Sequence, residues 1–563
     1  MSGQVRDMTK GSPAKLILLF AVPLMLGNIF QQLYTMVDTI VVGQVAGVQA
    51  LAALGAVEWI MWMVLGVSTG VTQGFSILIS QHYGARKWDD LKKAVAHSYL
   101  LTAVTAVSLL VISQIAARWI LVLLNTPENI IGMSLTYLRI VFCGIPIVAA
   151  YNIFASVLRA LGNSRTPLIA MIIASIINVI LDLVLVAGLH WGVAGAAVAT
   201  VTAQAFSAFY CFLVVRKIDI VHISRNDFKH VPGLNRKLFT LGAPILFQDV
   251  IISVGGLAVQ FVINGYGFLF VAGFTATNKL YGVLEMAAIS YGYAVVSYVG
   301  QNLGAGEISR IKKGVYASAF LAFLTSVFIS AIMFLFGKTL LSMFISGDPA
   351  QTEQVLAIAW HYLSIMASCL CILYFLYVYR SALQGLGNTM IPMLSGVVEF
   401  FVRVGIVLIL PRFVGQNGIF YAEIAAWTGA TVLLVISYYI NISKFTESYR
   451  IFSIFLNLGT VIKIIACIIK HIEKLLADMV GSLLFHFHSV PCSRLQIRSS
   501  NHTFNFFNNR LKEICDCFNN TFLFSLGFVV TKPLCKLLNA LICREKTRYS
   551  VVGKLVNRLG SCL

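Results

Sequence analysis

The chain has 563 residues, with 41 Lys and Arg against 22 Asp and Glu, which gives a formal net charge of +19. Charged residues make up only 11% of the chain and hydrophobic residues make up 58%, whereas soluble domains carry about 25% charged residues. So few charges cannot cover the surface of a soluble globule of this length. The composition therefore excludes disordered, collagen-like and disulfide-rich chains as well as cytosolic enzymes, and it predicts an all-α polytopic membrane protein.

Residues 1–15 are polar, and the apolar run that follows them lacks a cleavage site of small residues, so we expect a cytoplasmic N-terminus and no cleaved signal. From there on, apolar runs of about twenty residues recur, each long enough to cross about 30 Å of hydrocarbon. They predict twelve transmembrane helices, near residues 16–42, 50–78, 94–117, 133–156, 167–189, 193–215, 239–263, 268–298, 314–337, 357–379, 392–411 and 419–441.

The basic residues predict how these helices are oriented. If the N-terminus lies in the cytoplasm, the inner segments hold 19 Lys and Arg residues, among them Arg159 and Arg380, whereas the outer segments hold three, Arg118, Lys338 and Arg412. This imbalance predicts that both ends of the twelve-helix body are cytoplasmic, and it indicates a multi-pass protein of the plasma (inner) membrane. Because the charges lie in short loops between spans, we do not expect a nucleic-acid partner.

Two short motifs occur twice along the chain at nearly constant offsets. Gln81–Ala85 has the pattern Gln-x-x-Gly-Ala, which returns at Gln301–Ala305 after 220 residues. Leu161–Pro167 begins with Leu-Gly-Asn and ends in Pro, and the same spacing returns at Leu386–Pro392 after 225 residues. Proline is favoured in the first turn of a helix, so we expect the second motif to start a helix at the cytoplasmic side in each half.

The repeats predict two six-helix pseudo-symmetric lobes: an N-lobe at 16–216 with helices 1–6 and a C-lobe at 238–444 with helices 7–12, joined by a cytoplasmic linker at 217–237. An even number of spans in each lobe gives both lobes the same orientation, related by a two-fold axis along the membrane normal. Parallel repeats of this kind are typical of transporters, whose substrate site lies between the repeats near the middle of the membrane.

The tail at 445–563 differs from both lobes. It holds seven of the eleven cysteines, is basic, and lacks an uninterrupted apolar run of twenty residues. Cys515 and Cys517 form no Cys-x-x-Cys pair with other cysteines, so we expect no metal site there. Since the tail matches neither lobe, we expect it to be dispensable for transport.

Acidic residues are rare inside the spans, where a central charge costs at least ~2.5 kcal/mol. Asp38 lies in helix 1 and Asp182 in helix 5, with Asn178 one turn earlier on the same face and Thr200 in helix 6. Counted from the helix ends at about 1.5 Å per residue, all four fall in the outer half of the bilayer. They can therefore converge inside the N-lobe.

Such a cluster suits either of two tasks. Its oxygen atoms can replace the water shell of a hard cation, or its two carboxylates can share a proton and carry it. The alternative is a structural role, because polar side chains also hydrogen-bond between membrane helices. An acid inside a membrane span nevertheless favours a functional role.

The repeats and motifs together resemble the multidrug and toxic compound extrusion (MATE) family, the DinF-like and NorM-like cation-coupled exporters, over about residues 8–445. The resemblance implies that family's fold of twelve helices in two lobes. It implies a cation or proton-coupling site formed by Asp38, Asn178, Asp182 and Thr200, and it matches Pro23 to a helix-1 proline associated with bending. The cavity-lining candidates are Tyr137 and Asn152, which match polar residues of the family's cavity, and Gln31, Tyr34, Met171 and Glu285.

The C-lobe departs from this pattern. At the repeat offsets, the partners of Asp38, Asn178 and Asp182 are Val259, Arg403 and Val407. NorM-like members carry acids in helices 7 and 10, whereas here helix 10 has none and helix 7 offers only Asp249, which favours the DinF-like pattern. Glu399 lies one turn before Arg403, so we expect these two residues to form a neutralising ion pair.

We therefore interpret the chain as a secondary active antiporter and not as an enzyme. We expect it to export organic, cationic and amphipathic compounds in exchange for H⁺ or Na⁺, with no cofactor besides the coupling ion. The sequence contains no nucleotide-binding or hydrolase motif. The expected partners are small organic substrates and membrane lipids, and the expected state is a monomer. The alternative is a flippase for lipid-linked oligosaccharides, which a cavity ringed with Arg and Lys would favour.

Overall fold

The computed structural model describes residues 5–124, 126–345 and 349–444, all of which belong to one compact unit, Met1–Leu456. Within these ranges all regular secondary structure is helical. The predicted tail, 445–563, lies outside the described residues.

The first half of the chain forms seven α-helices and two π-helical turns. The helices are α1 (Pro13–Val41), α2 (Val48–Gly84), α3 (Trp88–Leu123), α4 (Glu128–Cys143), α5 (Ile145–Ala160), α6 (Arg165–Asp182) and α7 (Gly192–Arg216). The π-helical turns are η1 (Val42–Ala46), which continues α1, and η2 (Leu183–Gly188), which continues α6. We call this part the N-lobe.

Two short 3₁₀ turns, η3 (Asp219–Val221) and η4 (Arg225–Phe228), occupy the predicted linker. The second half then forms α8 (Leu234–Asn264), α9 (Phe268–Gly304), α10 (Ile308–Ser342), α11 (Pro349–Ser368), α12 (Leu370–Gly385), α13 (Met390–Ile409), α14 (Pro411–Val414), η5 (Gln416–Phe420) and α15 (Tyr421–Lys444). We call this part the C-lobe.

These helices supply the twelve predicted membrane spans. Ten helical segments among the described residues are long and apolar enough to cross a membrane, and the bent pairs α4–α5 and α11–α12 bring the number to twelve. The bends measure 46° and 50°. They fall at Gly144 and Cys369, which are equivalent positions at the offset of 225. Each predicted apolar run lies inside one helical segment or bent pair to within a residue, so the prediction of twelve spans is confirmed.

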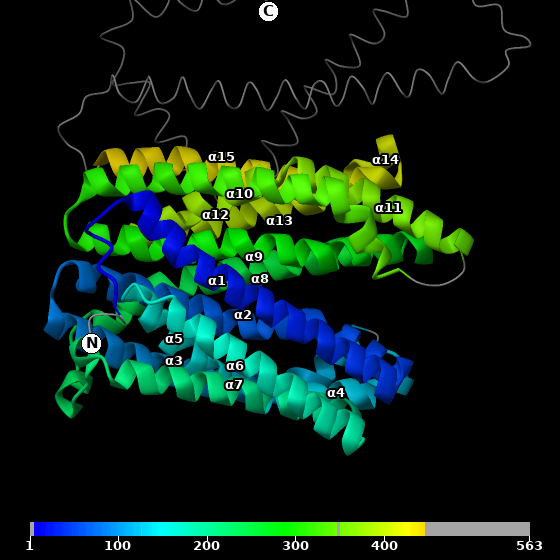
Figure 1. Cartoon of the computed structure of the whole chain (residues 1–563), viewed down its shortest axis with the longest axis horizontal. Helices are drawn as coiled ribbons and strands as arrows, with labels where there is room; N and C mark the ends of the chain where they lie inside the picture. The colour runs from blue at the N-terminus through cyan, green and yellow to red at the C-terminus, as the bar shows by residue number, and fades with distance from the viewer. Residues whose placement is uncertain (1–4, 125, 346–348, 445–563) are drawn as a thin grey trace, which may run out of the picture. The chain divides into compact units, whose positions relative to one another are not determined.

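The two lobes meet along four long helices. Figure 1 shows α1 and α2 of the N-lobe beside α8 and α9 of the C-lobe, with the other helices of each lobe farther out. Helix α2 packs against both α8 and α9, and α1 packs against α9 and α10. Inside the N-lobe, α6 contacts α1 and α7, and α5 contacts α2 and α7. This packing brings the predicted polar residues of α1 and α6 into one region.

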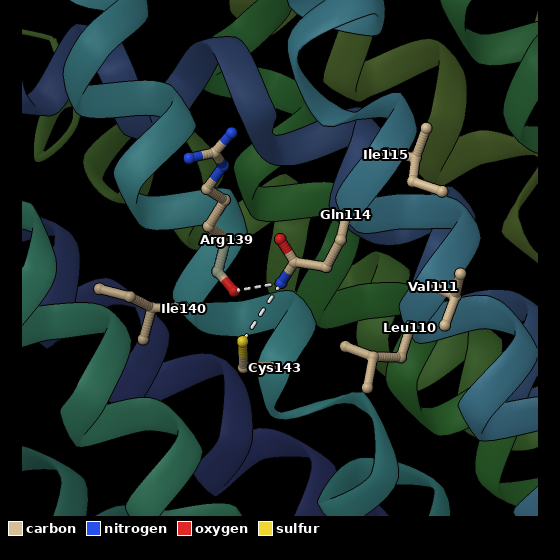
Figure 2. A pocket seen from close by; sticks show the side chains of 7 residues that line it. All are labelled: Leu110, Val111, Gln114, Ile115, Arg139, Ile140 and Cys143. Carbon is tan, nitrogen blue, oxygen red and sulfur yellow. Dashed lines mark hydrogen bonds between the residues drawn. The ribbon is translucent and has the colours of Figure 1, made fainter.

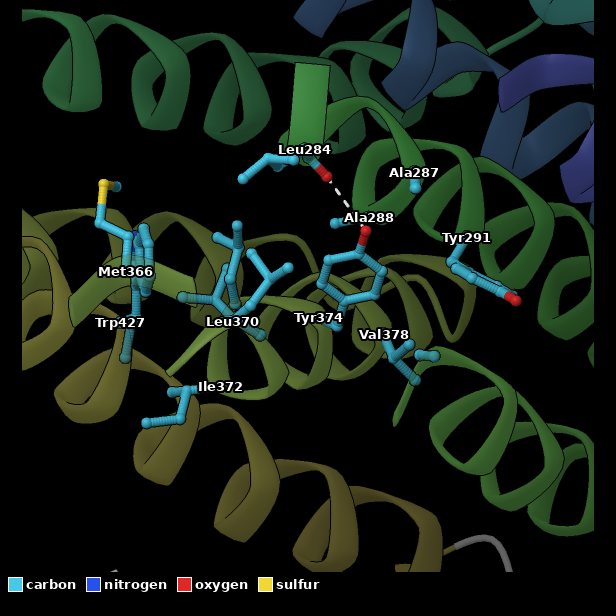
Figure 3. Close-up of a cluster of buried hydrophobic side chains, with 14 of the residues drawn as sticks. Leu284, Ala287, Ala288, Tyr291, Met366, Leu370, Ile372, Tyr374, Val378 and Trp427 are labelled. Atoms are coloured by element: carbon cyan, nitrogen blue, oxygen red, sulfur yellow. Dashed lines mark hydrogen bonds between the residues drawn. The ribbon is translucent and has the colours of Figure 1, made fainter. Parts of the chain in front are cut away.

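Apolar clusters fill the interior of the described residues, and two of them contain side chains from both lobes. In the N-lobe, α3 and α4 also form a shallow pocket on their outer surface (Figure 2). In the C-lobe, the buried cluster gathers side chains of α9, α12 and α15, including Tyr291, Leu370 and Trp427 (Figure 3). The hydroxyl of Tyr374 in this cluster donates a hydrogen bond of 3.0 Å to the carbonyl of Leu284, which satisfies a polar atom inside the lobe.

The two copies of the Gln-x-x-Gly-Ala motif pack against each other. A Cβ added to Gly84 would lie 1.8 Å from the carbonyl oxygen of Gln301, and a Cβ added to Gly304 would lie 1.9 Å from that of Gln81. Only glycine tolerates so close an approach of a neighbouring backbone. The contact is reciprocal, so each copy of the motif uses its glycine to admit the backbone of the other.

The Leu-Gly-Asn motifs start α6 and α13, as predicted. Gly162 and Gly387 have φ angles of 81° and 84°, in the left-handed region that favours glycine. The side-chain oxygens of Asn163 and Asn388 then accept hydrogen bonds of 3.0 and 3.3 Å from the backbone N–H three residues later. These bonds satisfy donors that the first turn of a helix leaves without partners.

The N-terminal segment, residues 5–12, is part of the packed structure. The N–H of Arg6 donates to the carbonyl of Leu161 at the end of α5, over 3.2 Å. Met8 is fully buried, and its N–H donates to Oε1 of Gln301 over 2.8 Å. The guanidinium of Arg310 donates to the carbonyl of Gly11 over 3.0 Å. The segment therefore joins the two lobes at the ends of α5 and α9, on the predicted cytoplasmic side.

Candidate functional site

Asp38, Asn178 and Asp182 form the polar centre of the N-lobe. Asp38 is 6% exposed, and Asn178 and Asp182 are fully buried. The side-chain amide of Asn178 donates a hydrogen bond of 3.5 Å to the hydroxyl of Thr200 on α7. Asp38 and Asp182 lie within range of each other's charge. The structure thus brings residues of α1, α6 and α7 together.

The cluster has an excess of hydrogen-bond acceptors. Within the described part of the chain, Oδ1 of Asp38, both carboxylate oxygens of Asp182 and Oδ1 of Asn178 are buried without a hydrogen-bond partner. Buried polar atoms are nearly always hydrogen-bonded in folded proteins, because leaving one without a partner costs about 1–3 kcal/mol. Four oxygens that lack donors can be satisfied by protons or by a metal cation.

The local backbone at both aspartates is unusual. Asp38 lies one turn before the π-helical turn η1, and Asp182 is the last residue of α6, directly before η2. The two π-helical turns contact each other. Wider turns of this kind occur often at functional sites, because they interrupt the regular hydrogen-bond ladder of the helix. The sequence carries no signal for these turns.

Two buried tyrosines adjoin the aspartates. Tyr34, one turn before Asp38, is 8% exposed, and its hydroxyl lies 3.5 Å from the side-chain amide of Gln204. Tyr137 on α4 is 6% exposed and lies within range of the charges of Asp38 and Asp182. Gln31 precedes Tyr34 by three residues on the same helix face. These three candidates therefore belong to the neighbourhood of the cluster.

The remaining N-lobe candidates make other contacts. The side-chain amide of Asn152 donates to the hydroxyl of Thr69 over 3.2 Å, which links α5 to α2. Met171 is buried in an apolar cluster near Gly27, where α6 crosses α1. Helix α1 continues through Pro23 up to Val41 without a break. Because proline has no backbone N–H, Pro23 leaves one carbonyl of the preceding turn of α1 without its helical hydrogen-bond donor.

The C-lobe holds a chain of buried ion pairs instead of an acid cluster. Glu399 pairs with Arg380 of α12, and Arg403 pairs with Glu423 of α15 over 2.8 Å. The predicted pair of Glu399 with Arg403 is present, but at 3.9 Å it is the longer contact. The partners Arg380 and Glu423 were missed, because pairing between helices depends on helix rotation, which the sequence pattern does not give.

Two arginines of the predicted inner segments lie within helices, near their C-terminal ends. Arg380 is buried within α12, which continues to Gly385, beyond the predicted end of that span. Arg159 lies within α5, with its guanidinium 4.4 Å from the centre of the Tyr293 ring on α9. Both residues follow a long apolar run, so the apolar pattern alone ends these helices too early.

Three further acids lie on α2, α8 and α9, the helices along which the lobes meet. Glu285 is half-buried on α9 and accepts a hydrogen bond of 2.8 Å from the hydroxyl of Tyr377. Glu58 of α2 pairs with Lys279 of α9 over 2.8 Å, so this ion pair joins the lobes. Asp249 of α8 faces α2, where a Cβ added to Gly70 would lie 3.0 Å from its Oδ2 atom.

Comparison with known proteins identifies the family. The MatE family model matches residues 23–184 and 244–410, one match in each lobe and more than half of the chain in total. "Probable multidrug resistance protein YpnP" of Bacillus subtilis is 30% identical over 424 residues, which cover 73% of this chain and 92% of that protein. "Probable multidrug resistance protein YoeA" of the same organism is 32% identical over 336 residues, which cover 58% of this chain and 73% of that protein.

The fold comparison agrees with the family match. A solved structure of a MOP superfamily transporter from Pyrococcus furiosus, described as having reverse polarity of its binding pocket, superposes with a TM-score of 0.74 at 21% identity. The superposition covers 78% of this chain and 98% of that chain. The chain therefore belongs to the MatE family, the multidrug and toxic compound extrusion proteins, whose members are multi-pass membrane transporters and not enzymes.

Proposed function

We propose that the protein is a secondary active antiporter that exports organic, cationic and amphipathic compounds in exchange for H⁺ or Na⁺. Asp38 and Asp182, with Asn178 and Thr200, form the coupling site of this proposal. One observation carries it: four buried oxygen atoms of the N-lobe cluster have no donor among the described residues. The names of the relatives, which are multidrug resistance proteins, support the substrate class.

Either coupling ion can satisfy the oxygen atoms of the cluster that lack a hydrogen-bond donor. A proton taken up by one carboxylate turns an acceptor into a donor, which can then hydrogen-bond to Asn178 or to the second carboxylate. A Na⁺ ion takes carboxylate, amide and hydroxyl oxygens as ligands in place of its water. In both cases the negative charge that two neighbouring carboxylates build up inside the membrane is reduced.

The position of α1 connects this site to the rest of the molecule. Asp38 lies on α1, and α1 contacts α6 inside the N-lobe as well as α9 and α10 of the C-lobe. Neutralising Asp38 changes how α1 packs on α6, and a rearrangement near Pro23 then changes the contact between the lobes. The substrate binds between the lobes in this proposal and does not need to touch the aspartates.

The charges of the C-lobe favour a cationic substrate over the flippase alternative. Arg380 and Arg403 are neutralised by Glu399 and Glu423, so neither arginine is left to bind a pyrophosphate. Glu285 and Asp249, which lie on α9 and α8 where these helices pack along the N-lobe, are acidic. The proposal includes an inner-membrane location with both ends of the twelve-helix body cytoplasmic, and a monomer as the working unit.

The test replaces the coupling carboxylates without changing their size. In proteoliposomes, the Asp38→Asn and Asp182→Asn variants should each lose nearly all efflux of a fluorescent organic cation driven by a pH or Na⁺ gradient. Binding of that cation should remain, because coupling and substrate sites are separate. Asp89→Asn is the matched control, because Asp89 is exposed in the first turn of α3. Near-normal gradient-driven efflux by the double variant would refute the proposed site.

A further inference from the structure

Arg139 is a charged residue on the outer surface of two membrane-spanning helices. It lies in the pocket between α3 and α4, together with Gln114, Cys143 and four aliphatic side chains (Figure 2). The neighbouring residues Val111 and Ile115 are 51% and 69% exposed. Large apolar side chains exposed on a membrane span face lipid. The guanidinium of Arg139 therefore lies on a surface that otherwise contacts hydrocarbon.

The structure gives the Arg139 guanidinium no acidic neighbour. Among the described residues, no ion pair, side-chain hydrogen bond or aromatic ring is recorded for it. The amide of Gln114 bonds to the carbonyl of Arg139 over 2.8 Å and to the sulfur of Cys143 over 3.2 Å, so the polar partners here are main-chain and sulfur atoms. An unpaired charge facing hydrocarbon is costly, so such residues normally pair or reach the interface.

The depth of Arg139 follows from Trp119. This tryptophan is 77% exposed on α3, and exposed tryptophans of membrane spans mark the interface. Gln114 lies five residues before Trp119 and therefore about 8 Å deeper at 1.5 Å per residue. Because Gln114 bonds to the backbone of Arg139, that backbone lies at the same depth. With the proposed orientation, this depth belongs to the outer leaflet.

The side chain of Arg139 leans back toward the interface. Side chains of an α-helix point toward its N-terminus, and α4 begins at the outer side. Figure 2 shows the guanidinium turned away from Cys143 and Leu110, toward the level of Ile115. The face above it carries the small residues Thr136 and Gly132, and a Cβ added to Gly132 would meet nothing within 4 Å. A bulky headgroup therefore has room there.

We propose that Arg139 binds the phosphate of an anionic phospholipid of the outer leaflet, with an acyl chain of that lipid lying in the groove between α3 and α4. The phosphate supplies the missing negative charge, and the planar guanidinium can donate two parallel hydrogen bonds to it. The aliphatic wall of the groove supplies the contact for the chain. This site is separate from the coupling site, and it does not depend on the proposed antiport.

Lipid binding to the purified full chain tests the proposal. Native mass spectrometry in mixed micelles of phosphatidylglycerol and phosphatidylcholine should show preferential retention of phosphatidylglycerol. Arg139→Gln should lower this retention at least about tenfold, the size of one charge-assisted contact, and Arg139→Lys should restore part of it. Arg118→Gln is the control, because Arg118 is also exposed on α3 but lies outside the pocket.

A second measurement separates a local effect from a folding defect. Cys143 is exposed and lies beside Arg139, so bound phosphatidylglycerol should slow its alkylation in the wild type but not in Arg139→Gln, as followed by mass spectrometry of its peptide. Equal retention of phosphatidylglycerol by wild type and Arg139→Gln would overturn the proposal. Equal protection of Cys143 by inorganic phosphate would also overturn it, because that result would indicate a simple anion site. A changed oligomeric state of Arg139→Gln would overturn it as well, because that result would indicate an interface between copies of the chain.

Discussion

Glu399 is a carboxylate placed between two buried arginines. It pairs with Arg380 and contacts Arg403 at 3.9 Å, and all three side chains are at most 6% exposed. Replacing one partner of a buried ion pair leaves an uncompensated charge, which costs about 3–5 kcal/mol. We therefore expect Glu399→Gln to lower the free energy of unfolding by about that amount, mainly by stranding Arg380.

Thermal unfolding of the purified variants, followed by size-exclusion chromatography in detergent, measures this effect. Glu58→Gln is the control, because the Glu58–Lys279 pair is nearly half exposed and should contribute at most about 1 kcal/mol. If Glu399→Gln melts at the wild-type temperature, the buried ion pairs do not stabilise the C-lobe. The double variant Glu399→Gln, Arg380→Met should recover part of the loss, since it removes the stranded charge.

Some residues of the site could be predicted from the sequence and others could not. Asp38, Asn178, Asp182 and Thr200 were predictable because polar residues are rare in apolar runs and helix spacing fixes their depth. The structure brings them together, although their role in coupling stays a prediction. Glu423 was not recognised as a partner of Arg403, because contacts between helices depend on how each helix is rotated.

At the scale of the elements, the contact between α2 and α9 depends on two glycines. A Cβ on Gly84 would lie 1.8 Å from the carbonyl oxygen of Gln301, which is backbone and cannot rotate away. Gly84→Ala should therefore force the two helices apart and cost about 1–3 kcal/mol, as overpacking does in protein interiors. Gradient-driven efflux should fall as well, because this contact joins the lobes.

Gly55→Ala is the matched control for this prediction. Gly55 lies in the same helix, α2, but a Cβ added there meets nothing within 4 Å. Because alanine favours a helix over glycine by up to about 1 kcal/mol, this variant should melt at the same or a higher temperature. A Gly84→Ala protein as stable and active as Gly55→Ala would show that the helices have room to shift at this crossing.

The sequence predicted the elements better than their irregularities. Twelve spans were predictable because each apolar run is long enough to cross the bilayer, and the two Leu-Gly-Asn motifs were predictable as helix starts because glycine, asparagine and proline have defined positions there. The bends at Gly144 and Cys369 and the π-helical turns after Asp38 and Asp182 were not. These features leave the apolar pattern unchanged, so the sequence gives no sign of them.

At the scale of the whole molecule, we expect the tail at 445–563 to be dispensable. The family match ends at residue 410, and the last described helix, α15, ends at Lys444. Truncation after Arg450 should leave a folded protein with normal gradient-driven efflux per molecule in proteoliposomes. A complete loss of efflux at normal expression would show that the tail takes part in transport.

The N-terminal segment has a consequence for how the chain is made. Its hydrogen bonds to Gln301 and Arg310 join residues that lie 293 and 302 positions apart. During synthesis residues 5–12 emerge long before these partners, because Gln301 lies at the end of the eighth span and Arg310 follows it. Contacts that close such long loops form late, because the entropy of closure must be offset by other interactions. Residues 5–12 therefore reach their final position long after they leave the ribosome.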